Sequence, residues 1–215
     1  LSISYRQVLK NYQKIYRIIM AVELSNIIKD WVPNKSKVID FGCGEGSLLK
    51  ELMIEKNVFG YGVEINDIKI QECIAKGVPV IKQDIDKGIN EFESANFDLS
   101  IMARSIQCLK NPNLALNRML SLSKRCVVTL PNLGYWKCRL DIMNGRMPVT
   151  PELPSSWYET ENIHLCTIKD FEKLCADEKI NIIDKVFLNR KGNRGKFTSL
   201  IPNLLAVEGV YLLEK

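Results

Sequence analysis

The sequence predicts a doubly wound α/β domain with a mostly parallel sheet and an antiparallel strand near the C-terminus. Short apolar runs alternate with segments of helical periodicity in five successive units. The first run passes directly into a turn with glycines at alternate positions. Near the C-terminus two extended runs follow each other with no helical pattern between them, which is typical of an antiparallel hairpin.

The composition is that of an ordinary globular protein. Of the 215 residues, 46% are hydrophobic and 26% are charged, which suits one domain with a sizeable core. A net charge of +5 is too small to indicate a nucleic-acid partner. No apolar run approaches the roughly 18 residues of a membrane span. The seven cysteines are scattered without a C-x-x-C pair, so we expect free thiols, no metal site and a cytoplasmic location.

Residues 1–36 are expected to form a helical extension ahead of a domain that spans residues 37–215. Apolar side chains recur every three or four residues from 5 to 31, and Pro33 ends the pattern. This helix has three open roles: it packs on the domain surface, covers the ligand site or forms a dimer contact.

The chain is organised around residues 38–46, V-I-D-F-G-C-G-E-G. The pattern predicts a buried strand, a tight turn and a helix that starts at Ser47. Glycines let a ligand approach the backbone, and a helix N-terminus offers unpaired N–H groups. A dinucleotide-binding turn would need glycine at position 47. The D-x-G-x-G-x-G present here resembles motif I of class I S-adenosylmethionine (SAM)-dependent methyltransferases; a turn that only packs strand on helix is the alternative.

The next two predicted strands also end in acidic residues. Residues 58–65 form the second strand, and Glu64 has the spacing from the turn expected of an acid that binds a ribose; a solvated strand-end acid is the alternative. Asn66 caps the helix that follows, and Gly77 ends it. The third strand, 79–85, carries Asp84, which in the methyltransferase interpretation accepts from the adenine amino group.

Two further interpretations concern the region around Asp84. Ile85 is expected to pack near the adenine ring. Asp84 also fits as the cap of a helix over residues 86–92, and this alternative does not exclude an adenine contact.

The remaining elements complete the alternation. Residues 97–102 form the fourth strand, and residues 103–108 occupy its carboxyl mouth, where α/β folds place ligands. Asn111 and Pro112 begin a helix, and residues 126–130 form the fifth strand. Thr167 caps a helix that ends near Ala176.

Two extended runs close the chain, at 180–188 and 204–213, and a basic segment at 189–196 joins them. We expect this segment to be a solvated hairpin tip, with contact to an acidic partner as the alternative.

Residues 131–166 form a long, loop-rich insert on the expected ligand side of the sheet, and such loops are usually functional. We expect it to be a lid over the acceptor of the methyl group. The residues proposed for the acceptor side are Arg104, Trp136, Arg139, Trp157 and Tyr158. His164, the only histidine, is a candidate general base, and a hydrogen-bonded structural role is the alternative.

Seven motifs carry a more specific resemblance: V-I-D-F-G-C-G-E-G, Y-G-V-E-I, Q-D-I-D-K-G, L-P-N-L-G-Y-W, G-R-M-P-V-T, N-I-H-L-C-T-I-K-D-F-E and I-P-N-L-L. Together, over residues 37–213, they resemble the methionine biosynthesis MetW family. The resemblance implies a Rossmann-like class I methyltransferase fold with a seven-stranded sheet, and an association with homoserine O-acyltransferase. It departs from the family at Ala103-Arg104, where we expect Ser-Gln, and this bears on the acceptor mouth.

The resemblance also implies SAM or S-adenosylhomocysteine (SAH) as the cofactor. The expected contacts with the cofactor are Asp40, Gly42, Cys43, Gly44, Glu64, Ile65, Asp84 and Ile85. Two functions follow as hypotheses. The first is methyl transfer from SAM to an unidentified small molecule, an in-line displacement that depends mostly on positioning. The alternative is a non-catalytic SAM-binding partner or regulator of homoserine O-acyltransferase.

Overall fold

The structure is a computed structural model that describes residues 2–88, 96–151, 153–160 and 164–215, with the side chains of the N-terminal helix described from Lys14 onward. The strands are β1 (Lys37–Phe41), β2 (Phe59–Glu64), β3 (Val80–Lys82), β4 (Phe97–Ala103), β5 (Ser123–Pro131), β6 (Asn181–Leu188) and β7 (Glu208–Glu214). The α-helices are α1 (Ser2–Trp31), α2 (Ser47–Lys56), α3 (Asp67–Ala75), α4 (Pro112–Leu122), α5 (Trp136–Met143), α6 (Ile168–Asp177), α7 (Lys196–Leu200) and α8 (Pro202–Leu205). Two short 3-10 helices are η1 (Ile85–Lys87) and η3 (Ile106–Cys108).

The strands form one sheet in the order β3-β2-β1-β4-β5-β7-β6. The five strands β1 to β5 pair in parallel, while β7 pairs antiparallel with both β5 and β6. This confirms the predicted fold class, including the antiparallel strand near the C-terminus. The chain winds in opposite directions from β1 and β4, so a ligand-binding crevice is expected at their carboxyl ends.

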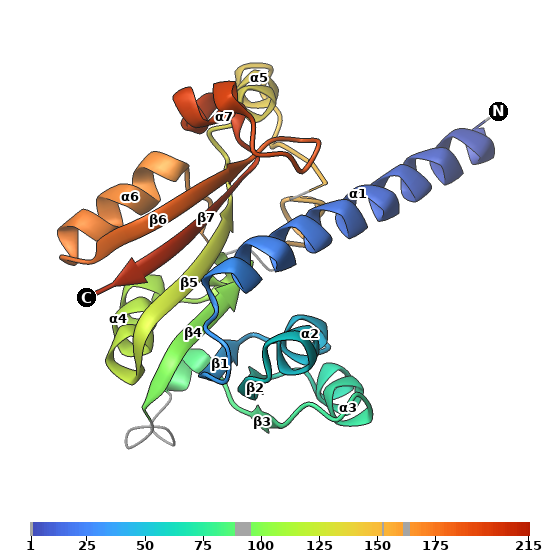
Figure 1. The fold of residues 1–215 in the computed structure, drawn as a ribbon. Coiled ribbons are helices and arrows are strands. Elements are labelled where there is room, and N and C mark those ends of the chain that lie inside the picture. The colour runs from blue at the N-terminus through green and yellow to red at the C-terminus, as the bar shows by residue number, and fades with distance from the viewer. Residues whose placement is uncertain (1, 89–95, 152, 161–163) are drawn as a thin grey trace.

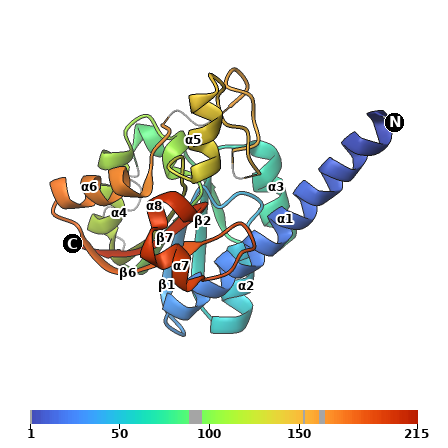
Figure 2. The ribbon, with the colours of Figure 1, turned by 90° about the horizontal axis from the view of Figure 1, so that it is seen from above.

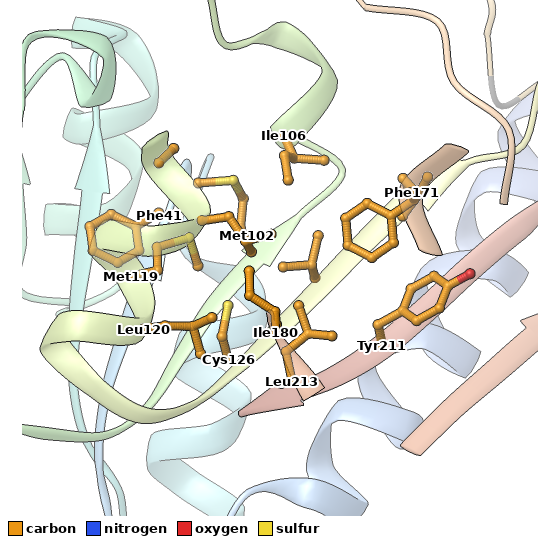
Figure 3. Packing of buried hydrophobic residues seen from close by; sticks show 14 of the residues in the cluster. Phe41, Met102, Ile106, Met119, Leu120, Cys126, Phe171, Ile180, Tyr211 and Leu213 are labelled. Atoms are coloured by element: carbon orange, nitrogen blue, oxygen red, sulfur yellow. The ribbon is translucent and has the colours of Figure 1, made fainter. Parts of the chain in front are cut away.

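Helices cover both faces of the sheet, with α1, α2 and α3 on one side and α4 and α6 on the other (Figure 1). Strand side chains alternate between two apolar clusters: Val38 packs with the first group of helices, and Ile39 and Phe41 with the second. Figure 3 shows the second cluster, in which Phe171 of α6 and Tyr211 of β7 lie with ring centroids 4.7 Å apart. Because apolar clusters cover both faces of the sheet, most positions along the central strands are apolar.

Among the described side chains of helix α1, those of its C-terminal half pack on the domain. Tyr16, Met20, Leu24 and Ile27 are buried in the cluster that α1 shares with α2. The N-terminal half projects away from the sheet (Figures 1 and 2). On the face opposite the buried residues, Ile15, Ile18, Ile19 and Val22 form an exposed apolar stripe. Of the three roles considered for this helix, packing on the domain surface is therefore observed for its C-terminal half.

Two strand boundaries were wrong. The third strand ends at Lys82 rather than at residue 85, because Asp84 accepts from the backbone N–H of Asp86 and starts η1. Much of the helix expected over 86–92 lies outside the described residues. The last strand begins at Glu208 rather than at residue 204, because Pro202 has a fixed φ suited to a first helical turn and starts α8.

The basic segment 189–196 is solvated at Lys191, Asn193, Arg194 and Lys196, as expected, but it also packs against α1. Gly192 is buried beside Ile19 of α1, to the extent that an added Cβ would lie 3.1 Å from its side chain. Arg194 pairs with Glu23 at 3.5 Å and with Asp30 at 3.4 Å, both on α1. The chain's own helix therefore supplies acidic partners for this segment, and α7 and α8 complete the connection to β7.

Candidate functional site

A cavity of about 470 Å³ lies at the carboxyl ends of β1 to β4. Figure 2 looks down on this edge of the sheet. The lining residues come from the ends of these four strands and the segments that follow them: Gly42, Glu64, Ile65, Asn66, Lys69, Gln83, Asp84, Ile85, Asp86, Ala103, Arg104, Ser105, Cys108 and Leu109. The position is the one that the reversal of strand order predicts for a ligand.

The glycine turn between β1 and α2 forms one wall of the site. Gly42, Gly44 and Gly46 have φ values of +74°, +58° and +74°, a region in which L side chains are strained. At Gly42 an added Cβ would lie 2.7 Å from Oγ of Ser105. The turn and the segment after β4 are therefore so close that a residue with a side chain at position 42 would clash. The sequence prediction of a tight turn that leads into a helix is confirmed.

Asp40 lies beneath this turn with 2% of its surface exposed. Its Oδ1 atom is buried and has no hydrogen-bond partner in the described part of the chain. Burial, with a smaller contribution from the charge of Glu64, raises the pKa of Asp40 to about 7. Asp40 therefore has an unused acceptor at the edge of the sheet where the cavity lies.

Glu64 connects the ends of β1 and β2. Its Oε2 accepts from the backbone N–H of Gly44 at 2.9 Å, and its Oε1 accepts from those of Ile65 at 2.8 Å and Asn66 at 2.9 Å. Only 6% of the residue is exposed, so the alternative of a solvated strand-end acid is wrong. Glu64 lines the cavity and also holds the glycine turn in place.

Most of the other expected cofactor residues also line the cavity. Ile65, Asp84 and Ile85 do so, and Asp84 uses Oδ1 to cap η1 at 3.1 Å from the backbone nitrogen of Asp86. Capping is thus observed, and it leaves Asp84 on the cavity wall. The remaining expected contacts, Asp40, Cys43 and Gly44, do not line the cavity. The thiol of Cys43 lies 3.9 Å from that of Cys73 in α3.

Arg104 lines the cavity at the end of β4, in a left-handed conformation with φ of +57°. Its guanidinium forms a two-point pair with Glu208 of β7, with Nε 2.7 Å from Oε1 and Nη2 2.5 Å from Oε2. Its backbone N–H donates to Oγ1 of Thr129 at 3.0 Å. Glu208 is 1% exposed, and sequence reasoning did not single it out because the two residues are 104 positions apart.

The other four expected lid residues do not line this cavity. Trp136 and Tyr158 are exposed, and Arg139 donates to the backbone oxygen of Gly134 at 2.6 Å. Trp157 borders a separate, smaller hollow within the insert.

His164 is exposed and hydrogen-bonded, and it does not line the cavity either. Its backbone N–H donates to Gln107 at 3.0 Å, and its Nε2 lies 3.3 Å from the backbone oxygen of Lys110. These contacts join the insert to the segment that carries Cys108 and Leu109, two of the lining residues.

The described part of the chain contains neither a metal-binding cluster nor a helix suited to span a membrane. The side chains there include no group of three or more that is arranged to hold a metal ion. None of the described helices is both long enough and apolar enough for a membrane span.

Comparison with known proteins identifies the family. The family model for "Methionine biosynthesis protein MetW" matches residues 23–213. The chain belongs to the MetW family. A curated member, the bifunctional methionine biosynthesis protein MetXA/MetW of Rhodopirellula baltica, is 29% identical over 170 residues, which cover 74% of this chain. The match spans only 27% of that longer protein.

Several solved structures whose folds resemble that of this MetW chain are SAM-dependent methyltransferases. One from Archaeoglobus fulgidus has a TM-score of 0.62 at 14% identity and covers 93% of this chain and 94% of its own. The magnesium protoporphyrin IX methyltransferase of Synechocystis, solved with bound SAH, has a TM-score of 0.59 at 16% identity and covers 95% of this chain and 83% of its own. At such low identity the likeness establishes the Rossmann-like fold of this MetW protein.

Proposed function

We propose that this MetW chain binds SAM in the cavity at the carboxyl ends of β1 to β4 and transfers its methyl group to a small-molecule acceptor. The observation that carries the proposal is that Gly42 of the glycine turn, Glu64 and Asp84 line the same cavity, at the ends of three adjacent strands. The cavity continues to Arg104 and Ser105 at the end of β4, which leaves an acceptor side next to the cofactor side.

The residues present fit SAM in three respects. The buried, unpaired Oδ1 of Asp40 is an acceptor available to a polar donor of the ligand. Gly42 brings bare backbone to the cavity, as close approach of a ligand requires. Asp84 and Glu64 provide carboxylates for the adenine amino group and the ribose hydroxyls, and Glu64 would share its lone pairs between the ribose and the turn.

SAM, when bound, supplies an electrophilic methyl group on a sulfonium. The protein's part in such a displacement is to align the acceptor with that methyl and to exclude water. The lining of the described cavity carries no histidine, and its carboxylates Glu64, Asp84 and Asp86 already accept backbone hydrogen bonds, so we assign the lining a positioning role. Arg104, held by Glu208, is placed to orient the acceptor side of the cavity.

The hydrogen bonds of His164 lead to a prediction about its role. Because it lies outside the cavity, we expect His164→Asn to keep SAM affinity within about twofold of wild type. Calorimetric titration with SAM measures this. Transfer to a candidate acceptor, assayed in parallel, should change if the insert covers the acceptor. A large fall in melting temperature with unchanged transfer would instead assign His164 a purely structural role.

A second candidate function is that of a SAM-responsive partner of homoserine O-acyltransferase. It is favoured by the bifunctional MetXA/MetW relative, in which a MetW region belongs to a longer methionine biosynthesis protein. SAM is made from methionine, so a protein that binds it in this pathway would report the level of an end product. The association would use surfaces outside the cavity.

Titration of SAM with and without a homoserine O-acyltransferase separates the two functions. Coupling between binding events is reciprocal, so a regulator predicts that saturating partner shifts SAM affinity several-fold, and that Asp40→Ala removes the shift. An unchanged affinity rules out the regulator and leaves methyl transfer as the function.

The contact surfaces expected for the acyltransferase are the exposed stripe of α1 and the cations Arg190, Lys191 and Lys196. Arg194 of the same segment already pairs with α1. Charges at the rim of an interface mainly speed association, so binding through this segment should weaken between low and physiological salt.

A further inference from the structure

The glycine turn brings one of its own thiols close to a thiol of α3. Cys43 belongs to the turn itself and Cys73 to α3, and their Sγ atoms lie 3.9 Å apart. Cys43 is half-buried, while Cys73 has no exposed surface. All seven cysteines are free, and this pair adjoins the candidate cofactor site. The sequence, with no C-x-x-C motif, gave no indication that these two residues come together.

Both thiols are built into the structure of the turn. The Sγ of Cys73 donates to the backbone oxygen of Gly44 at 3.1 Å. The Sγ of Cys43 fills the space above Gly62 of β2, where an added Cβ would lie only 2.5 Å from the sulfur. Gly62 is thus constrained by the thiol of Cys43, and neither sulfur can move far without moving the turn.

We propose that Cys43 and Cys73 form a reversible disulfide that weakens SAM binding at the turn. The effect on SAM rests on the proposed function, whereas formation of the disulfide does not. An S–S bond is about 2.05 Å long, so the sulfurs must approach each other by roughly 1.9 Å. This movement breaks the contact of Cys73 with Gly44 and pulls Cys43, with its two flanking glycines, toward α3.

The reaction requires an oxidant of the hydroperoxide class. The Cys43 thiolate, the more exposed of the two, attacks the peroxide oxygen, the O–O bond breaks, and a sulfenic acid and an alcohol, or water, result. The Cys73 sulfur then attacks the Cys43 sulfur, the S–O bond breaks, and a disulfide and water form. Overall two thiols lose two electrons and two protons, and the peroxide is reduced.

The surroundings of the pair make this oxidation slow at neutral pH. Burial raises the pKa of both thiols, and the nearby carboxylates of Asp40 and Glu64 raise them further. At Cys73 the hydrogen bond with Cys43 and the charge of Lys76 act in the opposite direction. Because the thiolate is the nucleophile, the rate of disulfide formation should rise with pH.

The test uses the purified chain and hydrogen peroxide at pH 8.5. After the remaining thiols are blocked, peptide mass spectrometry should find a Cys43–Cys73 cross-link that dithiothreitol removes. Cys43→Ser and Cys73→Ser should each abolish it, while Cys166→Ser, which changes a half-buried thiol of the insert, should not. Oxidation confined to other cysteines, or sulfinic acid at Cys43 without a cross-link, would overturn the proposal.

The consequence for the cofactor is measured on the same samples by calorimetry. We expect oxidised wild type to bind SAM at least tenfold more weakly than reduced protein, with recovery on reduction, and Cys73→Ser to be insensitive to peroxide. By linkage, saturating SAM should slow cross-linking. A complete disulfide with unchanged affinity would refute the regulatory role. If reduced wild type does not bind SAM at all, the proposed function fails, and the mass spectrum still decides whether the disulfide forms.

Discussion

Replacing Glu64 with alanine should weaken SAM binding and destabilise the glycine turn at the same time. The carboxylate accepts from three backbone N–H groups, of Gly44, Ile65 and Asn66, in a residue that is almost fully buried. A buried donor without a partner costs about 1–3 kcal/mol, so we expect the free energy of unfolding to fall by about 3 kcal/mol. Loss of the charged acceptor for the ribose should weaken SAM binding by a further 1–3 kcal/mol or so.

Urea denaturation and calorimetry measure the two effects of Glu64→Ala separately. Glu45→Ala is the matched control, because Glu45 lies in the same turn but its side chain is 60% exposed and pairs with Lys76 at the surface. Its loss should change stability by less than about 0.5 kcal/mol. A folded Glu64→Ala variant with wild-type stability and wild-type SAM affinity would remove Glu64 from the site.

Asp40→Asn should stabilise the ligand-free protein above neutral pH and weaken SAM binding. The pKa of Asp40 is raised from 3.8 to about 7 in the folded protein, so the folded state binds this proton more tightly than the unfolded state. Relative to an ionised Asp40, the neutral carboxyl contributes stability that is fully present below about pH 4 and is lost as the pH rises through 7. The free energy of unfolding of wild type should fall by roughly 4 kcal/mol over this range. Because a buried asparagine amide also needs partners, we expect a gain of about 2 kcal/mol at pH 8.

The measurement is chemical denaturation of wild type and Asp40→Asn at pH 4 and pH 8 without SAM. Wild type should lose stability relative to the variant between these pH values. At pH 4 the variant should be the less stable protein by about 2 kcal/mol, because its buried amide lacks partners while the carboxyl of wild type is neutral. The SAM affinity of the variant at pH 8 should fall by tenfold or more, because the acceptor charge is gone. A variant that is less stable than wild type at pH 8 would show that the ionised carboxylate has a partner in the folded protein.

The two substitutions are expected to change stability in opposite directions. Glu64 stabilises the ligand-free fold because it accepts from the backbone of the turn, whereas Asp40 is buried with an unpaired oxygen. A buried, unpaired oxygen reduces stability, and a substitution that removes such a group is expected to be functionally costly where a ligand uses it. A measured rise in the stability of Asp40→Asn together with weaker SAM binding would support a binding role for Asp40.

The sequence by itself determined the five parallel strands, the helices between them and the two extended runs near the C-terminus, but not α5, α7 and α8. Period-two and helical spacing act between near neighbours, so the five parallel strands and the helices between them were predictable from local patterns. Local hydrogen bonds were equally accessible: Asn66 and Thr167 cap α3 and α6 as predicted, because each cap bonds backbone within three residues. The positions of Glu64 and Asp84 at strand ends followed from the same patterns, since parallel strands bring their carboxyl ends to one edge.

Only the tertiary structure decided which distant side chains meet. Arg104 pairs with Glu208, Cys43 lies against Cys73, and the basic loop binds α1 through Arg194. The partners are separated by 30 to 164 residues, and no local periodicity relates them. Such contacts depend on how helices and loops pack across the sheet, where a shift of a single turn exchanges one neighbour for another. For the same reason the insert was predicted only as a loop-rich segment, and its helix α5 was missed. The position of His164 beside the cavity rim, rather than inside the cavity, depended on its backbone bond to Gln107.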